Sequence, residues 1–258
     1  MTADRRPDAG PTVHRWLHAV RKRVDGGTDP ILWAVTLGGL ALVAGCGLVI
    51  AKLLDDVLGG DDTAQVDPQI TSWFVAHRTA TVSGAARWVT HLGDPLVVVF
   101  VVVSAVLVLI CLERRRLAVF VAMSSVGAAI ATGVAKSVVG RARPPRAIWE
   151  VAASGAAFPS GHATQSIACY GAIAVAAIVV VPSVRARKAV LAISTLVALS
   201  VGFSRVYLGV HWTSDVLCGW AVAALWLATL VLIGWARPRV KSQRALPDRE
   251  RSVKRPAA

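Results

Sequence analysis

Three short polar blocks, residues 136–144, 159–162 and 204–215, contain the residue types of a site that acts on an anion. They combine cations, two histidines and a carboxylate, although they lie within or beside apolar stretches long enough to span a bilayer. Ionisable groups are costly in such surroundings and therefore indicate a functional site. The cations suit an anionic ligand, and the spacing of histidine and aspartate suits covalent chemistry on it.

The predicted catalytic residues are His211, Asp215 and His162. His211 and Asp215 are four residues apart, so on a helix or helix-like turn they share one face. The carboxylate can then hydrogen-bond one imidazole nitrogen and leave the other free to attack phosphorus. His162 lies in a different block and is the predicted general acid for the leaving oxygen. A carboxylate beside only one histidine separates the roles of the two imidazoles.

The residues predicted to bind the phosphate come from all three blocks: Lys136, Arg143, Ser160, Gly161 and Arg205. The three cations supply charge and N–H donors, and a guanidinium matches phosphate oxygens two at a time. Ser160 is the expected N-cap of a helix whose first amides bind an anion, and Gly161 lets the backbone approach closely. Arg141 and Arg146 are interpreted as interface anchors or rim charges.

The elements that must position these residues are membrane-spanning helices. The chain has 258 residues, of which 55% are hydrophobic, and its mean hydropathy is +0.59. The net charge of +13 is spread over short clusters between apolar runs and in both tails, as topology signals are, so we expect no nucleic-acid partner. The four cysteines lie in different apolar runs, which indicates neither a disulfide nor a metal site.

The predicted fold is an all-α integral membrane bundle with six transmembrane helices, the fifth extending into its polar end. The predicted spans are residues 31–53, 95–112, 117–139, 162–181, 189–203 and 214–236. Basic clusters fall in the N-terminal tail, in two links and in the C-terminal tail, all on one side, which is therefore predicted to be cytoplasmic. Both termini are then inside, and the three polar blocks meet on the external face.

Domain boundaries follow from this layout. Residues 1–30 and 237–258 are predicted basic cytoplasmic tails, and residues 31–236 form the six-span membrane domain. Within it, residues 68–93 are interpreted as an external amphipathic helix that caps the site, because apolar residues recur at helical spacing among polar ones. The acidic residues of the first external loop are interpreted as solvated, and His77 and His91 as surface residues.

With these residues identified, the chain resembles the type 2 phosphatidic acid phosphatase superfamily, the lipid phosphate phosphatases that share an active site with vanadium haloperoxidases. Its signatures are a Lys and an Arg-Pro separated by six residues, then Pro-Ser-Gly-His, then Ser-Arg followed by His and Asp. All three stand complete between Lys136 and Asp215. The resemblance implies a reaction without metal or other cofactor, in which His211 becomes a phosphohistidine, Asp215 orients it and His162 protonates the leaving group and then activates water.

The expected substrate is a lipid with a terminal phosphate, because the predicted pocket lies at the boundary between bilayer and water. A polyprenyl diphosphate such as undecaprenyl diphosphate is favoured, and phosphatidylglycerol phosphate or phosphatidic acid is the second candidate. Two alternatives remain at this stage: phosphoryl transfer to another acceptor through the same phosphohistidine, and a non-enzymatic anion or lipid transporter. The expected location is the plasma membrane, with the site facing the extracytoplasmic side. The sequence leaves the oligomeric state open.

Overall fold

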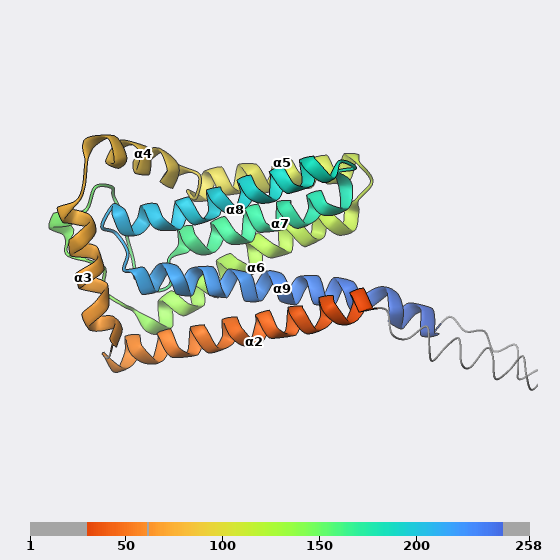
Figure 1. Cartoon of the computed structure of the whole chain (residues 1–258), viewed down its shortest axis with the longest axis horizontal. Helices are drawn as coiled ribbons and strands as arrows, with labels where there is room; N and C mark the ends of the chain where they lie inside the picture. Colours follow the sequence, from red (N-terminus) through yellow and green to blue (C-terminus); the bar gives the residue numbers. More distant parts are fainter. Residues whose placement is uncertain (1–29, 61, 245–258) are drawn as a thin grey trace, which may run out of the picture. The chain divides into compact units, whose positions relative to one another are not determined.

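All secondary structure in the described part of the chain, residues 30–60 and 62–244, is helical in the computed structural model (Figure 1). The elements are α2 (Pro30–Gly59), α3 (Asp62–Ala76), α4 (Ala80–His91), α5 (Pro95–Cys111), α6 (Arg115–Val139), η1 (Arg146–Ile148), α7 (Gly161–Val180), α8 (Val184–Tyr207) and α9 (Thr213–Arg244). The predicted all-α class is confirmed over these residues. The N-terminal tail up to residue 29 and residues 245–258 of the C-terminal tail lie outside the described part.

The chain divides into two units, Met1–Ala41 and Leu42–Ala258. The described part of the first unit is the beginning of helix α2. The second unit contains the rest of α2, all later helices and the three polar blocks. The fold that positions the candidate site is therefore the fold of the second unit.

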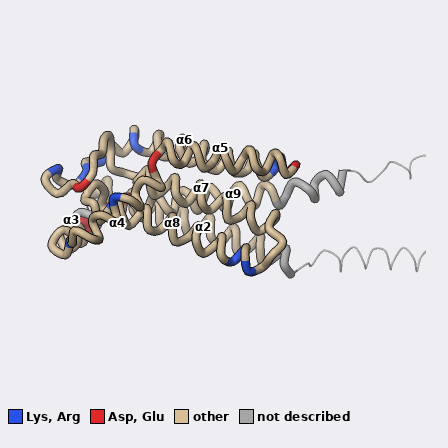
Figure 2. Tube along the Cα trace, turned by 90° about the horizontal axis from the view of Figure 1, so that it is seen from above, with Lys and Arg blue, Asp and Glu red and all other residues tan. Residues whose placement is uncertain are grey.

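Five described helices are long and apolar enough to cross a membrane, and a bent pair of helices raises the number to six if it forms one span. The five are Ala34–Gly59, Arg115–Val139, Gly161–Val180, Val184–Tyr207 and Thr213–Gly234. The fifth predicted span, 189–203, begins earlier than expected and extends into its polar end as predicted. Its helix begins after Ser183, whose hydroxyl caps Ala186, and continues through the polar residues up to Tyr207. Figure 2 shows charged residues toward the ends of the helices and few in between.

The bent pair consists of α4 and α5, which meet at an angle of 50°. We expected a single external helix over residues 68–93, but this region contains α3 and α4 instead. Thr79 caps the start of α4 by accepting a hydrogen bond from the amide of Val82. At the other end Asp94 has extended backbone dihedrals, as expected for a residue that precedes a proline. Pro95 therefore starts a new helix in a new direction.

Helix α7 lies at the centre of the helices and packs against α5, α6, α8 and α9. Its buried residues are mostly alanines, which allow neighbouring helices to approach closely. Glycines permit two further close contacts, since the space beside Gly127 is filled by the Trp226 ring and that beside Gly202 by the Trp220 ring. Large apolar side chains are exposed along the outer faces of the helices, as expected for surfaces that contact lipid.

Candidate active site

The three polar blocks meet at one end of the helices. Helices α6 and α8 end there, α7 and α9 begin there, and residues 140–160 form the loop between α6 and α7 (Figure 1). Seven of the eight predicted site residues lie in these segments, and His211 lies in the short loop between α8 and α9. Direct contacts and charge interactions link residues of the three blocks to one another. The predicted convergence of the three blocks is therefore present.

His211 and Asp215 form the predicted pair. The Nδ1 atom of His211 lies 3.3 Å from Oδ2 of Asp215, and the two side chains are 2% and 0% exposed. On the other side of the ring, Arg143 Nη1 donates to His211 Nε2 over 3.0 Å. Because a guanidinium has no acceptor, Nε2 must accept this bond, and the proton of a neutral ring is on Nδ1. The lone pair that the predicted attack requires therefore lies on Nε2, where it accepts from Arg143.

His211 lies in the short loop between α8 and α9, and burial lowers its pKa to about 4, against the opposing effect of Asp215. Its imidazole is therefore neutral at neutral pH. Asp215 is fixed by two further bonds, because the Trp212 amide donates to Oδ2 over 2.9 Å and Arg141 Nη1 donates to Oδ1 over 2.7 Å. A carboxylate held in this way orients the ring beside it.

The predicted phosphate-binding cations surround this pair. Arg143 donates to backbone carbonyls of Ser154, Gly155 and Val210 at 2.7–3.0 Å. Burial lowers the pKa of Arg143, and the charge of Asp215 opposes this effect. Lys136 donates to the carbonyl of Ala156. Charge interactions link Lys136 to Arg143, Arg205 and Asp215, so the three cations occupy one region.

Among the described residues of the three blocks, three buried polar groups have no hydrogen-bond partner in the protein. One is the Thr213 hydroxyl, and the other two, the Ser160 hydroxyl and the Nε–H of Arg205, belong to the predicted phosphate-binding residues. Ser160 is fully buried and Arg205 is 4% exposed. Ser160 stands at the N-cap position as predicted, but its hydroxyl does not make the capping bond. Unpaired buried polar groups are costly unless a ligand or water satisfies them. Both groups therefore point to a ligand with hydrogen-bonding oxygens.

Gly161 at the start of α7 and Gly219 in α9 differ in the space beside them. A Cβ on Gly219 would lie 2.9 Å from the Ser160 carbonyl oxygen and 2.9 Å from Thr164 Oγ1, so this glycine lets α9 approach the start of α7. A Cβ on Gly161 would meet no protein atom closer than 3.8 Å. The close approach expected at Gly161 is therefore not made by the protein, and room is left there for a ligand.

Within the described structure, the His162 side chain makes no hydrogen bond to a residue of the three blocks. It contacts a carboxylate outside them. Its Nε2 lies 2.9 Å from Oδ1 of Asp94, at the corner between α4 and α5. Arg143 and Arg205 interact with His162 through charge. The predicted general acid therefore faces the phosphate-binding cations and also has an acidic partner that we did not predict.

Arg141 corrects a sequence interpretation. We expected a rim charge, but its side chain is only 14% exposed and bridges Asp215 to Asp67, with nitrogen–oxygen distances of 2.7 and 2.9 Å. Asp67 also accepts from the amide of Ser214 over 3.0 Å and from its hydroxyl. Asp67 belongs to α3, and no motif marks it.

The expectation that the acidic residues of the first external loop are solvated is wrong for Asp56 and Asp67, which are 4% and 3% exposed. Asp56 lies in α2 and pairs with Lys52 at 2.5 Å, and Asp67 is held by Arg141 and Ser214. Among the described residues, no group of three or more His, Cys, Asp or Glu side chains could hold a metal ion.

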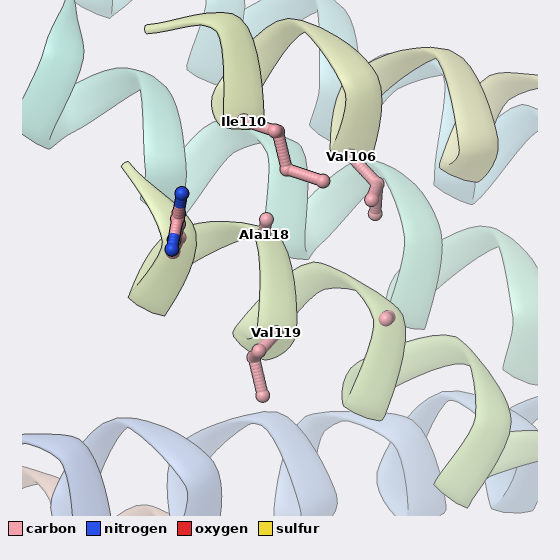
Figure 3. Close-up of a pocket in the computed structure, with 6 residues that line it drawn as sticks. Val106, Ile110, Ala118 and Val119 are labelled. Atoms are coloured by element: carbon pink, nitrogen blue, oxygen red, sulfur yellow. The ribbon is translucent and has the colours of Figure 1, made fainter. Parts of the chain in front are cut away.

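One cavity of the described structure is unrelated to these residues. It has a volume of about 390 Å³ and lies between α5 and α6 at the end of the helices away from the polar blocks (Figure 3). Its lining is apolar apart from one cation: Val106, Ile110, Arg115, Ala118, Val119 and Ala122. Such a lining fits an apolar ligand and contains no nucleophile or general acid. The candidate active site therefore remains at the end of the helices where the polar blocks meet.

Two proteins of known activity are similar to this chain in sequence. An undecaprenyl-diphosphatase of Sulfolobus acidocaldarius is 26% identical over 187 residues, which cover 70% of this chain and 84% of that protein. Phosphatidylglycerophosphatase B of Bacillus subtilis is 39% identical over 93 residues, which cover 36% of this chain and 45% of that protein. The chain thus matches less than half of the second relative.

Two solved structures have the same fold. A transmembrane PAP2 type phosphatidylglycerolphosphate phosphatase from Bacillus subtilis superposes with a TM-score of 0.65 at 24% identity, over 78% of this chain and 96% of that one. LpxE of Aquifex aeolicus gives 0.52 at 16% identity, over 64% and 94%. The sequence profile of the PAP2 superfamily matches residues 115–239, which contain all eight predicted site residues. Residues 115–239 of this membrane protein are therefore a PAP2 superfamily domain.

Proposed function

We propose that this PAP2 superfamily enzyme removes the terminal phosphate from a membrane lipid phosphate or diphosphate through a phosphohistidine on His211. The observation that carries this proposal is the pair of unpartnered donors, Ser160 Oγ and Arg205 Nε, buried beside a neutral histidine. Phosphoryl transfer depends on positioning and on stabilising charge at the phosphoryl oxygens. Cations, a free hydroxyl and a helix N-terminus supply both here.

In the first step the lone pair of His211 Nε2 attacks phosphorus. The bond from phosphorus to the leaving oxygen breaks with its electron pair on that oxygen, which takes a proton from His162. Arg143, which donates to Nε2 in the structure, turns its N–H groups to the phosphoryl oxygens instead. Asp215 accepts from Nδ1 and stabilises the positive charge that develops on the imidazole.

In the second step water attacks the phosphorus of the phosphohistidine. His162, now neutral, takes a proton from this water. The bond between phosphorus and nitrogen breaks and returns its electron pair to His211, and inorganic phosphate leaves. Each histidine thus regains its starting state, and neither step uses a metal ion. We expect a chelator to leave the activity intact, and a strict metal requirement would contradict this mechanism.

The favoured substrate class is a polyprenyl diphosphate, and phosphatidylglycerol phosphate or phosphatidic acid is the second candidate. The names of both curated relatives support a lipid phosphate, since one is an undecaprenyl-diphosphatase and the other a phosphatidylglycerophosphatase. We propose that the enzyme resides in the plasma membrane with its site on the extracytoplasmic side, because the basic links and tails then lie in the cytoplasm.

The test is phosphate release by purified protein in detergent, measured with undecaprenyl diphosphate, phosphatidylglycerol phosphate and phosphatidic acid. We expect His211→Ala to abolish release from all three and His77→Ala, outside the site, to leave it unchanged. With a ³²P-labelled substrate, rapid quenching should trap an acid-labile phosphohistidine in the wild type. Release by the His211→Ala variant would refute the proposed nucleophile. A wild type that is inactive on every lipid yet moves anions across liposomes would instead be a transporter.

A further inference from the structure

The corner between α4 and α5 lies against the predicted active site although no signature residue belongs to it. Asp94 at this corner contacts two histidines. Its Oδ1 lies 2.9 Å from His162 Nε2, and its Oδ2 lies 2.7 Å from His91 Nδ1. The same corner contributes Thr90, whose hydroxyl accepts a 2.6 Å bond from Arg205 Nη1.

This corner is held rigidly against α7 and α8. A Cβ on Gly93 would lie 2.5 Å from a methyl group of Val201 and 3.1 Å from Cδ2 of His162, so there is no room for a side chain between this backbone and the imidazole. Tyr170 of α7 donates its hydroxyl proton to the carbonyl of Leu92 over 2.7 Å. The backbone that carries Asp94 is therefore fixed against α7 and α8. This packing holds the Asp94 side chain beside His162.

We propose that Asp94 is a positioning residue for His162: it accepts the proton of Nε2, fixes the ring, and reserves Nδ1 for the leaving oxygen. This inference rests on the proposed function and extends it, because it gives each histidine its own carboxylate. Asp215 orients the nucleophile, and Asp94 orients the acid. Both lie outside the reacting atoms and act through the imidazole beside them.

Asp94 also affects the protonation of His162, because other charged groups surround this imidazole. Arg143 and Arg205, from the loop and from α8, repel a positive charge on this imidazole, whereas Asp94 attracts it. His91 is the other titratable group in contact with Asp94, and its side chain is 60% exposed. A general acid must carry its proton when the substrate arrives. Asp94 therefore supports the protonated form of His162 beside two fixed cations.

The leaving group distinguishes this role from a purely structural one. When the terminal phosphorus is attacked, the leaving group of a lipid monophosphate is the lipid alkoxide, which needs a proton. The leaving group of a lipid diphosphate is the lipid monophosphate, which needs a proton much less. We expect Asp94→Asn to lower kcat on farnesyl phosphate by about a hundredfold, the contribution typical of a positioned acid. On farnesyl diphosphate we expect a loss of less than about tenfold. The alkaline limb of the kcat profile should also move to lower pH.

Controls separate this inference from folding and from the proposed function. Asp94→Glu restores the charge and should recover part of the lost kcat. Asp55→Asn removes an exposed carboxylate from α2 and should leave kcat on both substrates unchanged. If Asp94→Asn fails to fold, the split between the two substrates is measured on Asp94→Glu and on His91→Gln. Equal losses on both substrates with an unmoved pH profile would overturn the inference. If His211→Ala is inactive as expected, such equal losses would overturn only the role of Asp94. Activity in His211→Ala would instead refute the proposed function itself.

Discussion

His211 is nearly fully buried, and this burial has a measurable consequence for its titration. Burial lowers its pKa from 6.5 to about 4, so the ring stays neutral as the pH falls from 7 to 5 and takes up a proton only near pH 4. Histidine NMR of ¹⁵N-labelled protein in detergent should show this, with the signal assigned by its loss in His211→Gln. A midpoint near 6.5 would contradict the environment described for this residue.

Arg141 and Arg146 lie five residues apart but differ in what they contact. Arg141 holds two buried carboxylates, those of Asp67 and Asp215, whereas Arg146 is exposed and stacks on Trp149. Removing one partner of a buried ion pair costs about 3–5 kcal/mol, because a charge is left uncompensated. Arg141→Met should therefore lower the thermal unfolding midpoint in detergent by several degrees. Arg146→Met is the control, and equal midpoints for the two variants would refute the bridging role.

The site residues that the sequence predicts lie in three short polar blocks, and within a block the local spacing indicates which side chains meet. His211 and Asp215 are four apart, and Ser160 and His162 begin one helix, so the pattern itself brings them together. Asp67 and Asp94 have no such signal. Their partners Arg141 and His162 lie 74 and 68 positions away. Only the packing of α3 and of the α4–α5 corner against the blocks creates these contacts, and sequence spacing does not describe that packing.

Among the helices, the close approach of α8 and α9 depends on one glycine. A Cβ on Gly202 would collide with the Trp220 ring, whereas a Cβ on Gly133 of α6 would meet no atom within 4 Å. Gly202→Ala should therefore destabilise the fold by about 1–3 kcal/mol, the usual cost of overpacking. Gly133→Ala should be neutral or stabilising, because alanine favours a helix. Unfolding midpoints of the two variants provide the test, and a more stable Gly202→Ala would contradict it.

The helices themselves were largely predictable, because a bilayer imposes a length and an apolar composition on each span. The start of α6, expected at residue 117, lies at Arg115, and that of α7, expected at 162, lies at Gly161. The pair α3 and α4 was not predictable in the same way. Each is too short to span a bilayer, and the turn between them is fixed by Arg78, which donates to the carbonyls of Tyr207 and Ile148 from far along the chain.

At the scale of the whole molecule, the proposed orientation places both termini in the cytoplasm. Green fluorescent protein fused after Ala258 should then fluoresce in a bacterial host, and an alkaline phosphatase fusion at the same position should be inactive. A water-soluble, membrane-impermeant phosphate ester should be hydrolysed by intact cells. The reverse pattern, a dark fluorescent fusion with an active phosphatase fusion, would place the polar blocks on the cytoplasmic side.

The loop between α6 and α7 is fastened by the very groups that a phosphate needs. Lys136 and Arg143 donate their N–H groups to carbonyls of Ser154, Gly155 and Ala156. An arriving phosphate and the enzyme's own backbone are thus competing ligands for one set of donors. We therefore expect bound phosphate to weaken the hydrogen bonds that hold this loop. Amide hydrogen exchange over residues 154–156 should accordingly become faster, not slower, when inorganic phosphate is added.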